Sequence, residues 1–217
     1  MYLPRHFEET SVEAMHALIR AHPLGTLVTL GAAGLNANHI PFVVHADMGE
    51  RGTLHAHVAR ANPVWSELAQ GGEALVIFQG PQAFISPAWY PTKNETGKVV
   101  PTWNYVAVHA YGPLRAIEDR DWLRRHVERL TASQEEGRPV PWRVADAPPD
   151  YIERQLGAIV GLEIPIVRLV GKWKVSQNRT DREREGVVAG LDAEGSESAA
   201  EMSRLVRCPG NKPGDGA

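Results

Sequence analysis

Alternation of polar and apolar residues predicts most of the extended segments in this chain. The clearest example is residues 53–58, where Thr53, His55 and His57 alternate with apolar residues and therefore share one face of a half-buried strand. Further strand signals cover residues 24–30, 35–46, 74–78, 82–86, 103–117 and 159–175. Apolar residues at helical spacing, or cap residues ahead of them, predict helices at residues 12–19, 63–71, 119–136, 151–156, from 180 onward and at 196–206.

The order of these elements predicts the fold class. Six or seven strands follow one another, most of them joined by short turns, and helices interrupt the series at only some places. Because strands and helices do not alternate regularly, a doubly wound parallel sheet is disfavoured. An antiparallel β-barrel with peripheral helices fits the pattern best, so the protein is expected to be mainly β.

The composition narrows the possible functions. The chain has 217 residues and a formal net charge of −3, so it has no global attraction for nucleic acid or anionic membrane. Its single cysteine, Cys208, excludes a disulfide within the chain and a cysteine-based metal site. No apolar run approaches the roughly 20 residues needed to cross a bilayer, and the first residues lack the apolar core of a signal peptide. A cytoplasmic protein without a membrane partner is therefore expected.

A first candidate site lies where the strand at residues 53–58 leads into a helix. Asn62 is a favourable cap and Pro63 a favourable first helical residue, and Arg60 lies just before them. Free backbone N–H groups and a guanidinium at one point would suit a phosphate. The alternative is an ordinary strand-to-helix turn that happens to carry an arginine.

Two further segments carry groups suited to a planar ligand. Pro41 lies inside a predicted strand, so that strand is expected to be at an edge or bulged, with backbone groups free for a heterocycle. Thr102, Trp103 and Asn104 follow a Pro-rich stretch at residues 87–101, which is expected to be a long irregular loop of the kind that often carries function. Trp103 could stack on a ring while its neighbours bond the ring edge, or the indole could simply fill the core.

The end of the last predicted strand is cationic and rich in donors. Lys172, Lys174 and Ser176 alternate onto one face, and Gln177 and Asn178 follow them. This group could hold a phosphate or a ribityl chain. Alternatively, the lysines could be ordinary solvated charges.

Other patterns are weaker. His55 and His57 could bind a metal with His39 or His109, but alternating histidines without a carboxylate motif do not predict a metal site. The arginines of residues 120–129 are interleaved with acidic residues, which indicates a solvated face rather than a nucleic-acid surface. No dinucleotide fingerprint or P-loop is present.

Taken together, these segments resemble the PaiB-type FMN-binding proteins, known as negative transcriptional regulators, within the FMN-binding split-barrel group. The resemblance extends from residue 1 to about residue 190. The motifs that carry it are MYLPRHF at residues 1–7, NHIPF at 38–42, HVARANP at 57–63, SPAWY at 86–90, PTWNY at 101–105 and KVSQN at 174–178.

The resemblance implies an antiparallel six-stranded split β-barrel, similar to the pyridoxamine-phosphate-oxidase-like group, that forms a homodimer with FMN near the subunit interface. Residues 1–190 would form the FMN-binding domain, and residues 191–217 a C-terminal helix followed by a disordered tail. The implied phosphate ligands are Arg60, Lys174 and Ser176. The implied contacts to ring and ribityl are Asn38, His39, Ile40, Pro41 and Phe42 through the backbone, with Thr102, Trp103, Asn104, Gln177 and Asn178. The two residues implied to face the cofactor are His55 and His57.

The resemblance implies a negative regulatory protein that binds FMN at a homodimer interface. The alternative is an FMN-dependent oxidoreductase acting on a small molecule, with His39, His57 or Tyr90 as acid or base. A third possibility is a dimeric barrel that has lost its cofactor. Direct DNA binding is not supported by the net charge or by any recognition-helix motif.

Overall fold

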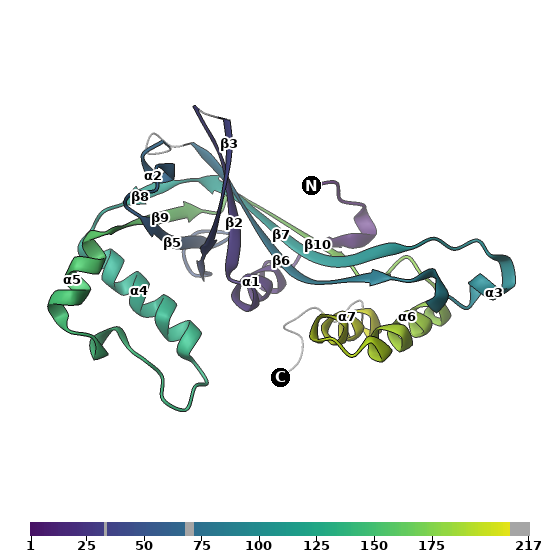
Figure 1. Ribbon diagram of the computed structural model, residues 1–217. Helices are drawn as coiled ribbons and strands as arrows, with labels where there is room; N and C mark the ends of the chain where they lie inside the picture. Colours follow the sequence, from purple (N-terminus) through teal and green to yellow (C-terminus); the bar gives the residue numbers. More distant parts are fainter. Residues whose placement is uncertain (33, 68–71, 209–217) are drawn as a thin grey trace. The chain divides into compact units, whose positions relative to one another are not determined.

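The computed structural model describes residues 1–32, 34–67 and 72–208 (Figure 1). The strands are β1 (Glu8–Glu9), β2 (Leu24–Gly31), β3 (Gly34–Pro41), β4 (Val43–His45), β5 (Thr53–Ala59), β6 (Glu73–Ile85), β7 (Thr102–Pro113), β8 (Arg115–Ile117), β9 (Ile159–Pro165) and β10 (Arg168–Lys174). The α-helices are α1 (Val12–Ala21), α2 (Val64–Glu67), α3 (Thr92–Thr96), α4 (Arg120–Glu135), α5 (Pro149–Gly157), α6 (Asp181–Glu194) and α7 (Glu197–Arg207). Short 3-10 helices are η1 (Arg5–Phe7), η2 (Pro87–Trp89) and η3 (Val144–Asp146).

The strands form two sheets, and the strand pairs with a determined register are antiparallel. The six-stranded sheet has the order β1-β10-β7-β6-β2-β3, and the four-stranded sheet has the order β4-β5-β9-β8. The prediction of a mainly β protein with antiparallel sheets and peripheral helices is confirmed. β3, whose last residue is Pro41, lies at one edge of the six-stranded sheet. This confirms the edge strand predicted from that proline.

Three predicted strands are each divided in the structure, and two others are joined. Residues 35–46 form β3 and β4, which belong to different sheets, whereas residues 74–78 and 82–86 both lie in the single strand β6. Residues 103–117 form β7 and β8, which belong to different sheets and are separated by the buried Leu114. Residues 159–175 likewise form β9 and β10, with a break before Arg168. A continuous β-rich run does not reveal where a chain passes from one sheet to another, because both parts carry the same residue types.

The chain forms two compact units, which are described separately. Unit 1 comprises residues 1–21, 79–109 and 170–217, and unit 2 comprises residues 22–78 and 110–169. This grouping differs from the predicted segments 1–190 and 191–217, which remain a prediction. The predicted tail after Cys208 lies outside the described residues, as does the predicted end of the helix at residues 68–71.

In unit 2, β5 is buried on both of its faces. β4 and β9 flank it in the sheet, with Ala56 opposite Leu162. α4 and α5 pack beside this sheet (Figure 1). Their apolar side chains form a small core with η3, made of Leu123, Val144, Ile152 and Leu156. β5 was expected to be half-buried. Because α4 covers the face that carries the histidines, both faces of β5 are buried instead.

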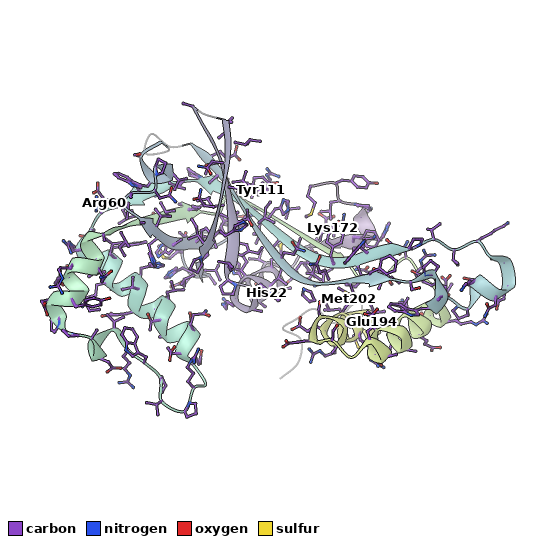
Figure 2. The ribbon with its side chains drawn as sticks, in the orientation of Figure 1. His22, Arg60, Tyr111, Lys172, Glu194 and Met202 are labelled. Carbon is purple, nitrogen blue, oxygen red and sulfur yellow. The ribbon has the colours of Figure 1, made fainter. Side chains whose placement is uncertain are left out.

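In unit 1, α6 and α7 lie side by side (Figure 1). Thr180 and Glu183 form a capping box at the start of α6. Gly195, with φ of 65°, reverses the chain before α7. Leu191 and Met202 are fully buried, and Figure 2 marks Met202 on α7. Among the described helices, none has the length and apolar character needed to traverse a bilayer.

The Pro-rich stretch at residues 87–101 is more ordered than predicted. It contains η2 and α3, and Ser86 caps η2 by accepting a hydrogen bond from the backbone of Ala88. The indole of Trp89 lies against α6 at Gly190, where a Cβ atom would be 2.2 Å from the ring. The irregular-loop prediction is therefore wrong for residues 87–96, because proline starts short helices well.

Candidate functional site

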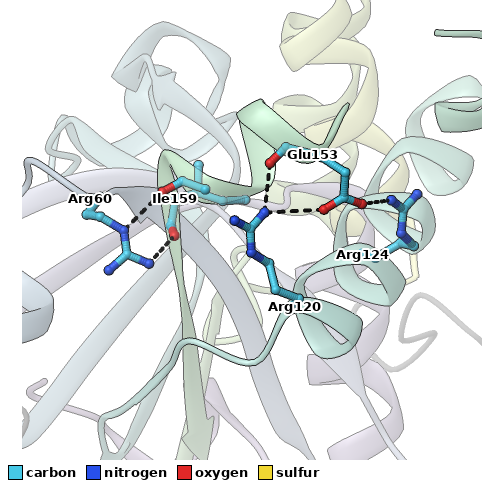
Figure 3. A network of polar contacts seen from close by, with 6 residues as sticks. Arg60, Arg120, Arg124, Glu153 and Ile159 are labelled. Atoms are coloured by element: carbon cyan, nitrogen blue, oxygen red, sulfur yellow. Dashed lines mark hydrogen bonds and ion pairs between the residues drawn. The ribbon is translucent and has the colours of Figure 1, made fainter. Parts of the chain in front are cut away.

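Arg60 is held inside unit 2 by three acceptors, and Figure 3 shows its contacts with the segment at Ile159. Its Nη1 atom donates to Glu118 Oε2 at 2.6 Å, and its Nε and Nη2 atoms donate to the carbonyls of Gly157 at 3.1 Å and Ile159 at 3.3 Å. The guanidinium thus links β5 to the segment between α5 and β9. A phosphate could take the Nη1 donor that now bonds to Glu118 only in exchange for that carboxylate. The predicted phosphate role of Arg60 stays a prediction.

The helix start beside Arg60 is formed as the sequence predicts. Asn62 Oδ1 accepts from the backbone N–H of Val64 at 3.0 Å, which caps the first turn of α2. Its Nδ2 atom donates to Asn38 Oδ1 at 2.9 Å. Asn38 on β3 and the turn after β5 are therefore joined by side chains, which brings two of the predicted motifs together in unit 2.

The rest of the segment at residues 38–42 alternates in exposure. His39 is exposed, and its Nδ1 atom lies 3.1 Å from the hydroxyl of Thr26 on β2. Ile40 and Phe42 are buried. Since β3 is an edge strand, its outer backbone groups have no ladder partner in the sheet, as a role in binding a heterocycle would require.

His55 and His57 lie in a cluster of imidazoles beneath α4. His57 Nδ1 is 3.1 Å from Nε2 of His126, a residue of α4. The ring of His55 lies 4.0 Å from that of His45 on β4. Sequence reasoning missed His45 and His126, because nothing local in the sequence shows that α4 and β4 meet β5 there.

Charged groups of unit 2 surround this cluster. Arg129 Nη1 lies 2.9 Å from His45 Nδ1. Glu163 Oε2 approaches His55 Nε2 to 3.3 Å without hydrogen-bond geometry, and that nitrogen has no hydrogen-bond partner. Among the described residues, no group of three or more His, Cys, Asp or Glu side chains is arranged to hold a metal ion.

Burial keeps these imidazoles neutral. Desolvation, with the charges of His55 and Arg129, lowers the pKa of His45 to about 4. Desolvation and Arg129 lower the pKa of His55 to about 4 as well. Desolvation and the neighbouring histidines lower the pKa of His126 to about 3, and burial also lowers the pKa of His57. At neutral pH the cluster adds no positive charge to unit 2.

The clearest gathering of predicted residues is in unit 1, where β7 begins and β10 ends. The Nζ atom of Lys174 donates to Thr102 Oγ1 at 2.5 Å and to the carbonyl of Trp103 at 2.7 Å. The indole of Trp103 is 54% exposed and meets the 43% exposed ring of Phe84 edge-on at 5.9 Å. Segments 72 residues apart thus supply a cation and an exposed aromatic face at one place.

Lys172 and Arg179 add positive charge near Lys174. Lys172, marked in Figure 2, is buried, donates to the carbonyl of Tyr2 at 3.1 Å and lies 5.1 Å from the centre of the Tyr105 ring. Burial, Lys172 and Arg179 together lower the pKa of Lys174. No carboxylate forms an ion pair with either lysine among the described residues, whereas Arg179 has Glu183 at 3.9 Å.

Asn104, Ser176 and Gln177 are used within this region. Asn104 Nδ2 donates to Ser176 Oγ at 2.9 Å, and both side chains are buried. Gln177 accepts from the backbone N–H of Val175 at 2.8 Å and donates to the carbonyl of Trp173 at 2.5 Å. Asn178 is exposed.

The described residues fit an anionic ligand at the end of β10. Of the three N–H donors of the Lys174 ammonium, two are bound to neutral oxygen atoms and one is free. A negative group there would relieve the repulsion among three neighbouring cations. A cavity of about 750 Å³ between α4 and residues 141–145 in unit 2 contains none of the predicted cofactor ligands.

Tyr90 and the arginines of α4 were also singled out in the sequence. The buried hydroxyl of Tyr90 has no hydrogen-bond partner among the described residues. Tyr90, a possible acid, is buried, and the Arg179 guanidinium lies 4.7 Å from the centre of its ring. The arginine-rich face of α4 pairs with α5, because Arg120 and Arg124 both contact Glu153 (Figure 3). This agrees with the predicted mixed, solvated face.

Comparisons with known proteins agree with the resemblance. Residues 1–168 match the family model described as "Putative FMN-binding domain". The chain is 32% identical over 206 residues to the protease synthase and sporulation protein PAI 2 of Bacillus subtilis, covering 95% of this chain and 96% of that protein. It is 35% identical over 242 residues to an uncharacterized protein of Emericella nidulans, with coverage of 95% and 96%.

Solved structures share the fold at lower identity. The FAD and haem binding protein from Mycobacterium smegmatis has a TM-score of 0.59 and 20% identity, covering 84% of this chain and 80% of that one. The flavocytochrome Anf3 from Azotobacter vinelandii has a TM-score of 0.58 and 13% identity, covering 79% and 72%. The family itself is shown by the sequence matches: this chain belongs to the PaiB-type FMN-binding family, whose cofactor is a flavin.

Proposed function

We propose that the protein binds FMN in unit 1, with the phosphate held by Lys174 at the end of β10. One observation carries the proposal: Lys174 has a free N–H donor, two cationic neighbours and no carboxylate in an ion pair with it among the described residues. Charge-assisted bonds from an ammonium to phosphate are among the stronger hydrogen bonds in proteins. Lys172 supports the phosphate through its charge.

The neighbouring groups suit the remainder of the cofactor. The exposed indole of Trp103 offers a face for the flavin ring, and the Thr102 hydroxyl and Asn178 amide offer bonds to the ring edge or ribityl chain. Bound flavin would supply the redox chemistry, and the chain would orient it. Residues 38–42, His55, His57 and Arg60 all belong to unit 2, and their predicted cofactor roles stay predictions.

We further propose that the strands complete a six-stranded split barrel and that the protein is a homodimer with FMN near the subunit interface. The exposed Phe84–Trp103 pair supports this, because an aromatic pair left in water beside a ligand site is typical of an interface. A second copy would cover both rings.

The proposed role is negative regulation, in which flavin or its redox state is the signal. The resemblance to the PaiB-type proteins, known as negative transcriptional regulators, supports it, and the relative from Bacillus subtilis is named a protease synthase and sporulation protein. The net charge of −3 favours action through a protein partner over direct contact with DNA. If the FMN-loaded protein oxidised NADH or NADPH faster than free FMN does, the protein would instead be an oxidoreductase. A mobility shift of upstream DNA that fades steeply with salt would assign direct DNA binding.

The phosphate site is tested by comparing FMN with riboflavin, which lacks only the phosphate. Lys174→Met should weaken FMN about tenfold to a hundredfold, as expected for loss of a charged hydrogen bond, and should change riboflavin affinity much less. Lys98→Met is the matched control, because Lys98 is an exposed lysine of the same unit. Equal losses for the two ligands, measured by quenching of flavin fluorescence, would refute a phosphate contact by Lys174.

A further inference from the structure

The contacts between β7 and β10 reveal a reversal of the chain directly after Lys174. Lys172 lies over Tyr105, and Lys174 reaches back to the carbonyl of Trp103, so the contacts run in opposite directions along the two strands. If β10 continued antiparallel to β7 past Lys174, Ser176 would lie opposite a residue that precedes Thr102, the first residue of β7. Its hydroxyl instead accepts a hydrogen bond from Asn104. The chain has therefore left the strand direction at Ser176.

The backbone of Ser176 makes this reversal. Its φ is 67°, and it is the one non-glycine residue with positive φ among those described. An L-residue with a Cβ atom adopts this conformation only when its surroundings enforce it. The backbone N–H of Arg179 donates to the Ser176 carbonyl at 3.0 Å, which closes a turn over residues 176–179.

The hydrogen bond between Asn104 and Ser176 is buried. Asn104 is 1% exposed and Ser176 is 4% exposed, so neither side chain has an open surface for a ligand. A buried amide–hydroxyl bond is costly to break, because each group would then lack a partner. Both residues nevertheless belong to motifs that the sequence links to the cofactor.

We propose that Asn104 and Ser176 are positioning residues that hold the turn after β10, and thereby hold Lys174 at the cofactor phosphate, without contacting the cofactor themselves. The inference rests on the proposed phosphate role of Lys174. Two hydrogen-bonded links join the same two segments, Thr102 to Lys174 and Asn104 to Ser176. The hydrogen bond between Asn104 and Ser176 fixes the backbone two residues beyond Lys174. It thereby restricts the positions that the Lys174 ammonium can occupy.

The two possible roles of Ser176 predict different results for glycine and alanine. Both substitutions remove the hydroxyl, but only glycine accepts a positive φ without strain. If Ser176 positions the turn, Ser176→Ala should lower the ratio of FMN affinity to riboflavin affinity about tenfold. The ratio for Ser176→Gly should then lie between the ratios for the alanine variant and the unchanged protein. If the hydroxyl contacts FMN, the two variants should bind equally weakly.

A double-mutant cycle in the full-length protein completes the test. Lys174→Met combined with Ser176→Ala or Asn104→Ala should lose little more FMN affinity than Lys174→Met alone, because both positions act through Lys174. Additive losses, or equal affinities for the glycine and alanine variants, would overturn the inference. An unchanged ratio in Ser176→Ala and Asn104→Ala would overturn it too.

The outcome also separates this inference from the proposed function. If Lys174→Met lowers the ratio while the Ser176 and Asn104 variants do not, the phosphate site stands and only the positioning role fails. If Lys174→Met itself leaves the ratio unchanged, both fail. Thermal unfolding without ligand identifies any variant that has lost its fold. If Ser176→Ala or Asn104→Ala does not fold, the affinity ratio of Ser176→Gly is compared with that of Lys174→Met instead.

Discussion

His57 Nδ1 and His126 Nε2 lie 3.1 Å apart, joining a strand to a helix across 69 residues of sequence. One imidazole must donate and the other accept, so at least one of the rings is neutral. With His45 and His55 they form a group whose members all have lowered pKa values. The stability of unit 2 should therefore depend on pH.

We expect the melting temperature to fall as the pH is lowered from about 6.5, the ordinary pKa of histidine, toward the folded-state pKa of about 4 for His45 and His55. In that range the unfolded chain binds protons that the folded chain excludes, so stability is complete above the range and lost within it. Arg129 opposes protonation, whereas Asp47 and Glu163 favour it at His45. Calorimetry of His126→Phe should show a shallower pH dependence, and an unchanged slope would contradict the assignment.

The packing of Trp89 on α6 predicts an unusual effect of alanine. Gly190→Ala would place a Cβ atom 2.2 Å from the indole. We expect a loss of roughly 1–3 kcal/mol in unfolding free energy, typical of overpacking, although alanine normally stabilises a helix relative to glycine. In a Trp89→Ala background the same substitution should instead be neutral or stabilising. Stabilisation in the parent protein, by denaturant titration, would show that Trp89 does not pack there.

Arg60 permits a second test of phosphate recognition. As predicted from the sequence, Arg60→Ala should weaken FMN more than riboflavin, by about ten- to a hundredfold for a charge-assisted bond. Glu118→Gln is the informative companion, because it removes the carboxylate that now pairs with the guanidinium. It should strengthen FMN binding if Arg60 serves the phosphate. Equal losses of both ligands in Arg60→Ala would make Arg60 a structural link of unit 2 only.

The exposed aromatic pair predicts the assembly state. Phe84→Asp should shift the protein from dimer to monomer, because a charge would be buried at the proposed interface. Light scattering after size-exclusion chromatography gives the mass directly. Tyr151→Asp is the control, because Tyr151 is also a partly exposed aromatic residue but belongs to unit 2. A dimer that persists in Phe84→Asp would place the interface elsewhere.

Local signals in the sequence predicted several features of individual elements. Pro41 indicated an edge strand, Asn62 marked the start of a helix, and Asp119 marked another, and the structure contains all three features. In each case the reason is covalent or lies within a few residues: a missing N–H, or a side chain that caps the following turn. Such signals do not depend on what packs against the element.

Long-range pairing was harder to predict. His55 and His57 looked like a polar face, yet α4 buries that face by bringing His126 and Trp122 against it. Asn104 and Ser176 are predicted ligand contacts, and their hydrogen bond to each other could not be foreseen from the sequence. Their residue types suit both roles equally, and only the register of distant segments distinguishes them.

The segment from residue 87 to residue 97 has a consequence for kinetics. Three separate contacts hold this segment against α6. Thr92 donates a hydrogen bond to Glu183, Glu95 forms an ion pair with Arg182, and the Trp89 indole packs against Gly190. We therefore expect this segment to keep its position when a ligand binds. Flavin association measured by stopped flow should accordingly show one phase whose rate rises linearly with concentration, with no plateau from a slow rearrangement.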